Sequence, residues 1–179
     1  KQSMTINSLG YIGINSAQRD EWVKFGCQVM GLEDVTEHLG ADSAGDLFFK
    51  MDDHPFRIVV NASDSEGLAF CGWECNNQQG LAELAEQLSA AKVPFEWAGA
   101  ELIAARRVQN LLQFKDPSGN CHEAYWGRVS DFRHLNSPAG VPEFVTGEQG
   151  MGHIVLPAVN FDATVEFFQS LGFGLSDLM

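Results

Sequence analysis

The residue best placed for chemistry is a histidine near the end of the chain. His153 follows glycines at 147, 150 and 152 and opens the apolar run Ile154-Val155-Leu156. An imidazole at the mouth of a strand can bind a divalent metal ion, and the glycines allow a tight turn before it. Taken alone, a histidine at a strand end is more often a hydrogen-bonded structural residue. The flanking sequence favours a ligand, and we therefore treat His153 as a candidate metal ligand.

The surroundings of His153 repeat the start of the chain. At an offset of 142 positions, four residues find a match, namely Gly10 with Gly152, Ile12 with Ile154, Asp20 with Asp162 and Phe25 with Phe167. Tyr11 stands where the later copy has His153. Agreement at scaffold positions with a difference at one polar position indicates a duplicated fold in which only the later copy kept its chemistry.

Composition excludes several classes of function. The 179 residues are 45% hydrophobic and 20% charged, which is typical of a globular protein. A net charge of -13 with only 11 Lys and Arg residues argues against nucleic acid and anionic membranes as partners. No apolar run approaches the ~20 residues of a membrane span, and the first residues given lack the basic start and apolar block typical of a signal peptide. Four cysteines lack the spacing of a zinc site or a disulfide scaffold, so we expect a soluble cytoplasmic protein with reduced, buried thiols.

Hydrophobic periodicity predicts the same order of elements twice, with one strand, one helix and then further strands. The first unit has a strand at 9–15, a helix at 19–30 ending at Gly31, and strands at 33–38, 47–51 and 56–61. The second has a strand at 68–75, a helix at 79–91, an extended piece at 94–97, a short helical or irregular stretch at 101–107, and strands at 111–115 and 121–127. These are two βαβββ units of an α+β fold.

The residues after 130 indicate the start of a second domain. We expect an expression scar or chain start at 1–4, a two-module first domain at 5–130, a linker at 131–149, and the first strand and helix of another domain at 150–179. Such a short piece cannot bury its own apolar side chains, so we expect it to leave six exposed, namely Phe161, Val165, Phe167, Phe168, Leu171 and Phe173. The expectation is therefore a truncated chain that is inactive by itself.

These features together resemble a known family. The paired units, the segment Gly150-Met151-Gly152-His153 and the preceding residues 144–149 resemble the type I extradiol ring-cleavage dioxygenases, the 2,3-dihydroxybiphenyl 1,2-dioxygenase group of the vicinal oxygen chelate superfamily. The resemblance extends from Ser8 to Met179 and is sharpest at 72–75, at 116–121 and before His153. It implies tandem βαβββ modules that form an open, barrel-like mixed sheet with flanking helices.

The resemblance also implies a chemistry. Such enzymes bind iron(II) through two histidines and one glutamate of the second domain, and His153 matches the first histidine. Val155 matches a position that contacts the catechol substrate. The other ligands and the acid–base residues would follow Met179. The implied reaction is ring opening by O2 of a bulky-substituted catechol, such as 2,3-dihydroxybiphenyl or a steroid-derived catechol, in a homo-oligomer of two to eight chains.

The first domain carries different residues at the matching positions. The resemblance places Tyr11, Phe70 and Glu123 where the second domain has its three ligands, so we expect a vestigial site without metal. The histidines at 38, 54, 122 and 134 are more simply surface or loop residues.

Two other functions remain open within the superfamily. A metal-free, antibiotic-sequestering protein would have only one pair of units, whereas this chain begins a third. A glyoxalase-type lyase or isomerase would need a metal ligand on the first strand, where Tyr11 stands.

Overall fold

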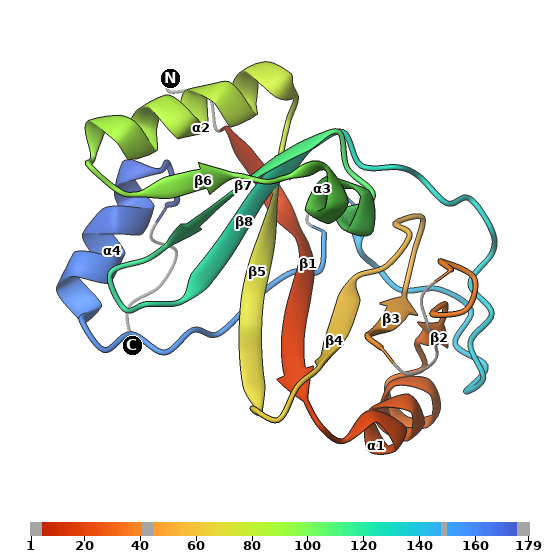
Figure 1. The fold of residues 1–179 in the computed structure, drawn as a ribbon. Coiled ribbons are helices and arrows are strands. Elements are labelled where there is room, and N and C mark those ends of the chain that lie inside the picture. Colours follow the sequence, from red (N-terminus) through yellow and green to blue (C-terminus); the bar gives the residue numbers. More distant parts are fainter. Residues whose placement is uncertain (1–4, 41–44, 148–149, 175–179) are drawn as a thin grey trace.

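The computed structural model describes residues 5–40, 45–147 and 150–174, and the expected scar at 1–4 and residues Glu148 and Gln149 lie outside them. Its centre is one mixed sheet of eight strands (Figure 1). The strands are β1 (Ile6–Ser16), β2 (Glu33–Asp34), β3 (Leu47–Lys50), β4 (Ile58–Ala62), β5 (Gly67–Cys75), β6 (Phe95–Trp97), β7 (Asn110–Lys115) and β8 (Cys121–Trp126). The helices are α1 (Arg19–Lys24), the π-helical turn η1 (Phe25–Val29), α2 (Gln78–Ala90), α3 (Ala100–Arg106) and α4 (Phe161–Ser170).

The sheet consists of two copies of one βαβββ unit. Its strand order is β2-β3-β4-β1-β5-β8-β7-β6, so each unit has the same internal order and the two meet where β1 pairs antiparallel with β5. In each unit the first strand runs parallel to the last, β1 with β4 and β5 with β8. The end strands β2 and β6 do not pair with each other, so the sheet is not closed. The predicted tandem fold is confirmed.

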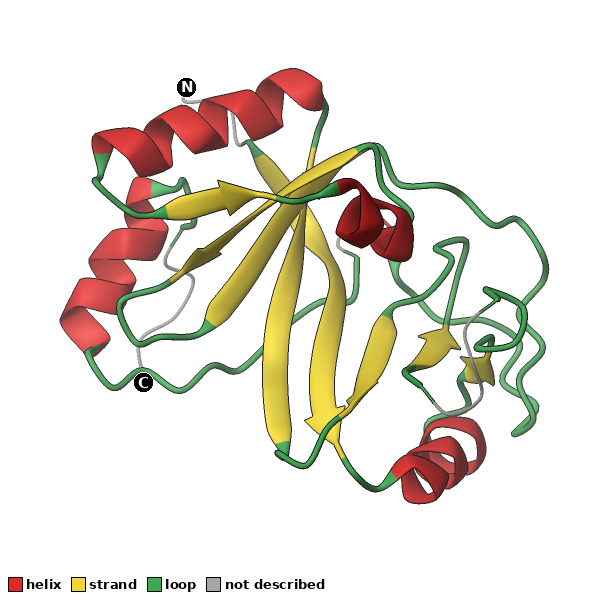
Figure 2. Cartoon of the chain, in the orientation of Figure 1, coloured by secondary structure: helices red, strands yellow, loops and turns green. Residues whose placement is uncertain are grey.

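Side chains on alternate sides of the strands build two apolar layers. On one side, Leu9, Cys71 and Trp73 join residues of α2 and α4 in a buried cluster. On the other side, Tyr11, Phe70 and Tyr125 form a cluster of aromatic rings, against which residues of α3 pack. Figure 2 shows α2 and α4 beside the β6–β7 half of the sheet and α1 at the opposite end. Neighbouring residues of one strand thus belong to different environments.

Two local predictions in the first unit were wrong in detail. The helix predicted over 19–30 is α-helical only to Lys24 and continues as η1, although Gly31 does end it with the expected positive φ of 77°. The strand predicted over 33–38 stops at Asp34. The Asp34 carboxylate accepts hydrogen bonds from the backbone N–H and the hydroxyl of Thr36, at 3.0 and 2.6 Å, and so bends the backbone into a turn.

The segment after residue 150 also differs from the prediction. Residues 152–156 run as an extended segment (Figure 1) but form no ladder with any described strand, and the isolated β-bridge nearby joins Leu9 to Gly150 instead. The expected exposure of the apolar side chains was largely wrong, since Phe167 and Leu171 are buried and Phe168 and Phe173 pack beside them against the first domain. Phe161 does remain 57% exposed. No helix in the described ranges has the length and apolar character to cross a bilayer.

Candidate functional site

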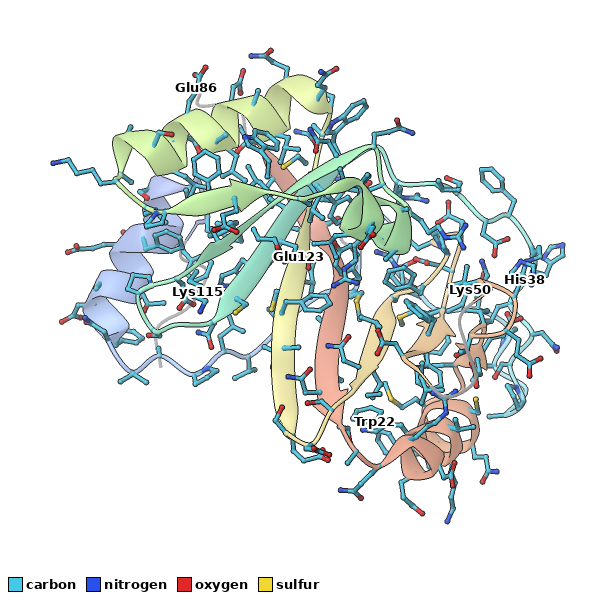
Figure 3. All side chains as sticks on the ribbon, viewed as in Figure 1. Trp22, His38, Lys50, Glu86, Lys115 and Glu123 are labelled. Carbon is cyan, nitrogen blue, oxygen red and sulfur yellow. The ribbon has the colours of Figure 1, made fainter. Side chains whose placement is uncertain are left out.

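Tyr11, Phe70 and Glu123 meet on one side of the sheet. The Tyr11 hydroxyl donates a hydrogen bond of 2.7 Å to Glu123 Oε2, and the rings of Tyr11 and Phe70 meet edge to face at 6.1 Å. Arg106 of α3 completes the group, with Nε and Nη2 at 2.8 and 3.1 Å from the Glu123 carboxylate. Gln113 Nε2 donates a further bond of 3.2 Å to Oε1. Glu123 lies near the middle of the sheet (Figure 3).

The electrostatics of this cluster favour a closed ion pair. Burial raises the pKa of Tyr11 well above its usual value, and the charge of Glu123 raises it further, so the phenol stays protonated and donates. Burial by itself would lower the pKa of Arg106, but the hydrogen bonds and charge of Glu123 outweigh it and raise that pKa. The guanidinium lies 4.3 Å from the centre of the Phe70 ring. An internal cation therefore neutralises Glu123, and both of its carboxylate oxygens accept hydrogen bonds.

His153 and Val155 lie on the exposed side of the segment that follows Gly150. Ile154 and Leu156 pack against the core cluster under α4, whereas His153 is exposed and Val155 is 91% exposed. The segment is held at both ends, because Met151 N donates to Leu9 O at 3.0 Å and the side chain of Asn120 donates to the carbonyl of Pro157 at 2.9 Å. The structure thus brings His153 and Val155 to one surface, and it does not bring them near Glu123.

Two histidines expected at the surface or in a loop are buried. His122 is 1% exposed, so that prediction was wrong, although it does face away from Glu123 as expected. Its Nδ1 accepts from Trp73 Nε1 at 3.0 Å, so its Nε2 carries the proton that faces Asp116 Oδ2 at 3.2 Å. His54 does lie in a loop but is only 5% exposed. By contrast, His38 lies at the surface (Figure 3), and His134 is also exposed.

One group of three ligand-type side chains occurs among the described residues, and it does not include His153. Atoms of Asp52, Asp53 and His54 lie within 4.8 Å of one another. Both carboxylates already pair with guanidinium groups, Asp52 with Arg57 and Asp53 with Arg128. Two fixed positive charges beside a divalent cation would oppose its binding, so we assign this group a structural role.

The comparisons with known proteins cover nearly the whole chain. Residues 9–62 match the family model described as Dihydroxybiphenyl dioxygenase BphC D1. Over 177 residues, 98% of its length, the chain is 40% identical to a protein of Rhodococcus jostii (strain RHA1) named iron-dependent extradiol dioxygenase, and it spans 57% of that relative. A biphenyl-2,3-diol 1,2-dioxygenase of Paraburkholderia xenovorans (strain LB400) is 36% identical over 178 residues, which cover 98% of this chain and 58% of the relative.

A solved structure extends the similarity to the fold. The crystal structure of BphC, a halotolerant catechol dioxygenase, superposes with a TM-score of 0.90 at 30% identity and covers 98% of this chain and 58% of its own. Over nearly its whole length the chain is thus similar to extradiol dioxygenases. It spans about three fifths of the length of the curated relatives it matches.

Among the described residues, His153 is the one that fits the iron site of an extradiol dioxygenase. The imidazole of His153 is exposed and has no hydrogen bond to any described residue. The ligand-type side chains that the described ranges bring together lie elsewhere, at 52–54. His153 therefore fits as a single ligand, and the described residues do not assemble a complete site around it.

The sequence reasoning missed the partners of Glu123. Arg106 lies three and four positions after Ile103 and Leu102, which pack on the aromatic cluster, so helical spacing places it on the same face of α3. Gln113 follows the buried Leu111 by two positions in β7, so both side chains lie on the side of the sheet that carries Glu123. Both signals were present in the sequence, but neither shows which carboxylate the two side chains would meet.

Proposed function

We propose that this chain takes part in extradiol ring cleavage of a catechol, with His153 as one protein ligand of a catalytic iron. The observation that carries the proposal is the position of His153, exposed on a segment held at both ends against the first domain. The identity to a relative named iron-dependent extradiol dioxygenase supports the same chemistry. In this proposal Glu123 and its partners hold the first domain together and take no part in the reaction.

The proposed roles follow from the types of residue. Iron(II) held by few protein ligands keeps coordination positions open for the two catechol oxygens and for O2. His153 would supply one neutral imidazole, and its exposure leaves room for ligands from elsewhere. Val155, two residues on and exposed on the same side, would contact the apolar part of the substrate.

The finer features of the proposal are the metal, the substrate, the oligomer and the location. We propose iron(II) as the metal and a bulky catechol as the substrate, because one relative is named for biphenyl-2,3-diol. A steroid-derived catechol is the alternative bulky substrate.

We also propose a homo-oligomer of two to eight chains and a cytoplasmic location. The location is supported by four free cysteines. Burial raises the pKa of Cys71 and of Cys75 to about 12, so both stay unreactive thiols.

Neither alternative function gains support from the structure. A glyoxalase-type enzyme would need a metal ligand on β1, but the Tyr11 hydroxyl there is bonded to Glu123, whose charge Arg106 already neutralises. A metal-free binding protein would have no use for an exposed histidine held at a fixed place after the second unit.

Replacing His153 tests the proposal in the natural full-length protein. Loss of a residue that hydrogen-bonds to a metal ligand typically weakens metal binding by ~10- to 100-fold. His153→Ala removes a ligand itself, so it should weaken iron binding by more than this, and ring opening of 2,3-dihydroxybiphenyl should fall with it. The two measurements are the iron content, by chelator titration, and the rate at which the coloured ring-opened product forms. His38→Ala, also an exposed histidine, is the matched control, and Tyr11→Phe should leave ring opening unchanged. Wild-type iron content in His153→Ala would refute the ligand assignment.

A further inference from the structure

The turn between β7 and β8 holds the segment that carries His153. Asn120 Nδ2 donates to Pro157 O at 2.9 Å, four residues after His153. Ser118 Oγ accepts from Asn160 N at 3.2 Å and shares a hydrogen bond of 2.8 Å with the Thr164 hydroxyl in α4. Three polar contacts thus join one turn of the first domain to the extended segment and to the helix after it.

The turn itself is fixed by a buried carboxylate. Asp116 is 5% exposed, and its Oδ1 accepts from the backbone N–H groups of Ser118 and Asn120, both at 2.9 Å. Oδ2 accepts from Asn120 Nδ2 at 2.7 Å and faces His122, which is bonded to Trp73 of β5. Burial alone would raise the pKa of Asp116, but the hydrogen bonds from Asn120 and His122 outweigh it and lower the pKa, so the acceptor stays charged.

The opposite end of the segment is fixed through backbone atoms. Met151 N donates to Leu9 O at 3.0 Å, and Gly150 forms a parallel bridge with Leu9. His153 therefore lies between an anchor on β1 and an anchor on the β7–β8 turn. Because 152–156 pair with no described strand, these anchors and the packing of Ile154 and Leu156 are what hold the imidazole in place among the described residues.

We propose that Asn120, Ser118 and Thr164 are positioning residues that set where His153 is presented to the metal. The inference rests on the proposed function, because it assigns a purpose to His153 as a ligand. A ligand must be held within ~0.5 Å of its productive position, and an extended segment without a strand partner has few other restraints. The first domain would thus contribute to the metal site of the enzyme by holding one ligand.

Substitutions that remove these contacts test the proposal in the natural full-length protein. Thr164→Val removes the hydroxyl that meets Ser118 with almost no change in shape, and Thr164→Ser retains it. Asn120→Ala removes the donor to Pro157 together with the bond from the same nitrogen to Asp116. Its control is Asn61→Ala, which loses a side-chain amide bond of 2.9 Å to Asn15 Oδ1 on the distant strand β4.

Two measurements separate positioning from mere stability. Thr164→Val and Asn120→Ala should each weaken iron(II) binding by about 10- to 100-fold, and excess iron(II) should restore kcat because His153 is intact. In the metal-free protein, hydrogen exchange should rise in peptides covering 151–164 and stay unchanged in β1, β5 and β8. Thr164→Ser and Asn61→Ala should match the wild type in both measurements.

Results that would overturn the positioning role can be distinguished from a failure of the proposed function. An active wild type whose Thr164→Val and Asn120→Ala variants keep normal iron affinity and normal exchange would overturn the positioning role alone. A loss of kcat that excess iron(II) does not restore would also overturn it, since the defect would then be structural. A wild-type protein that neither binds iron nor opens catechols would refute the proposed function and the positioning role together.

Discussion

At the scale of single residues, the most consequential contact is the one between Glu123 and Arg106. Glu123 is 1% exposed and accepts from three side chains, so its charge is compensated by hydrogen bonds as well as by the guanidinium. A buried ion pair contributes little net stability compared with apolar packing, but removing one partner leaves an uncompensated charge in a low-dielectric interior. The cluster therefore makes the first domain sensitive to loss of Arg106 in particular.

Arg106→Met should lower the free energy of unfolding by about 3–5 kcal/mol at pH 7, because it keeps the apolar stem but leaves Glu123 unpaired. Urea denaturation followed by circular dichroism measures the change. Arg107→Met is the matched control, since the side chain of this neighbouring arginine is exposed and its hydrogen bond among the described residues goes to the carbonyl of Leu39. Adding Glu123→Leu to Arg106→Met should recover much of the loss. A single variant as stable as the wild type would show that Glu123 needs no cation.

At the scale of elements, the loop between β3 and β4 holds the start of the linker. Lys50, fully buried, donates from Nζ to Asp131 O at 2.8 Å, and Asp131 N donates to Asp53 O at 2.7 Å. Arg57, 1% exposed, connects the same loop to β1 by donating to Gly10 O at 2.7 Å, and its Nε lies 3.0 Å from both carboxylate oxygens of Asp52. A chain of charged contacts therefore connects the first unit to the linker.

This network predicts a loss of stability in acid. Burial would raise the pKa of Asp52, but His54 and Arg57 outweigh it and hold that pKa far below its usual value. A depressed pKa stabilises the folded state above the unfolded pKa of about 3.9, and this stabilisation is lost as pH falls below that value. Asp52→Asn should thus cost on the order of 2 kcal/mol at pH 7 and progressively less below about pH 4.

Urea unfolding at pH 7, 5, 4 and 3 measures the acid effect. The exposed Asp64, which has no ion pair with another described residue, provides the matched control as Asp64→Asn. The control should change stability by less than ~0.5 kcal/mol at each pH. A constant difference between wild type and Asp52→Asn across this range would contradict the prediction.

At the scale of the whole molecule, the segment after the linker is integrated with the first domain. α4 places Phe167 beside the Phe114 ring at 6.0 Å, and Phe168 meets His122 edge to face at 5.4 Å. Leu171 is 2% exposed in the same cluster, which also includes residues of α2. The first domain and α4 therefore share one core.

Phe167→Ala should destabilise the protein by about 3–5 kcal/mol, because it leaves a cavity in this shared core. Phe161→Ala, in the same helix but 57% exposed, should change stability by less than ~0.5 kcal/mol. Thermal and urea unfolding of both variants provide the measurement. Equal effects of the two substitutions would indicate that α4 does not pack on the first domain in solution.

The sequence by itself determined the repeated unit and the positions of most elements. Alternating and helical spacings are local properties, so the patterns at 68–75, 79–91 and 121–127 predicted β5, α2 and β8 to within one or two residues. The same alternation correctly put Glu123 and His122 on opposite sides of β8. The sequence also pointed to His153 and Val155 as site residues, and both stay predictions.

The tertiary structure decided what these residues meet. Which cation neutralises Glu123 depends on how α3 crosses the sheet, and residues 17 positions apart come together only after folding. The burial of His122 and the covering of α4 likewise depend on contacts between segments distant in sequence, which periodicity does not encode. Residues 152–156 have strand-like alternation, but a strand requires a hydrogen-bonding neighbour as well as a pattern. Spacing fixes the face on which a side chain lies, and only packing fixes its partner.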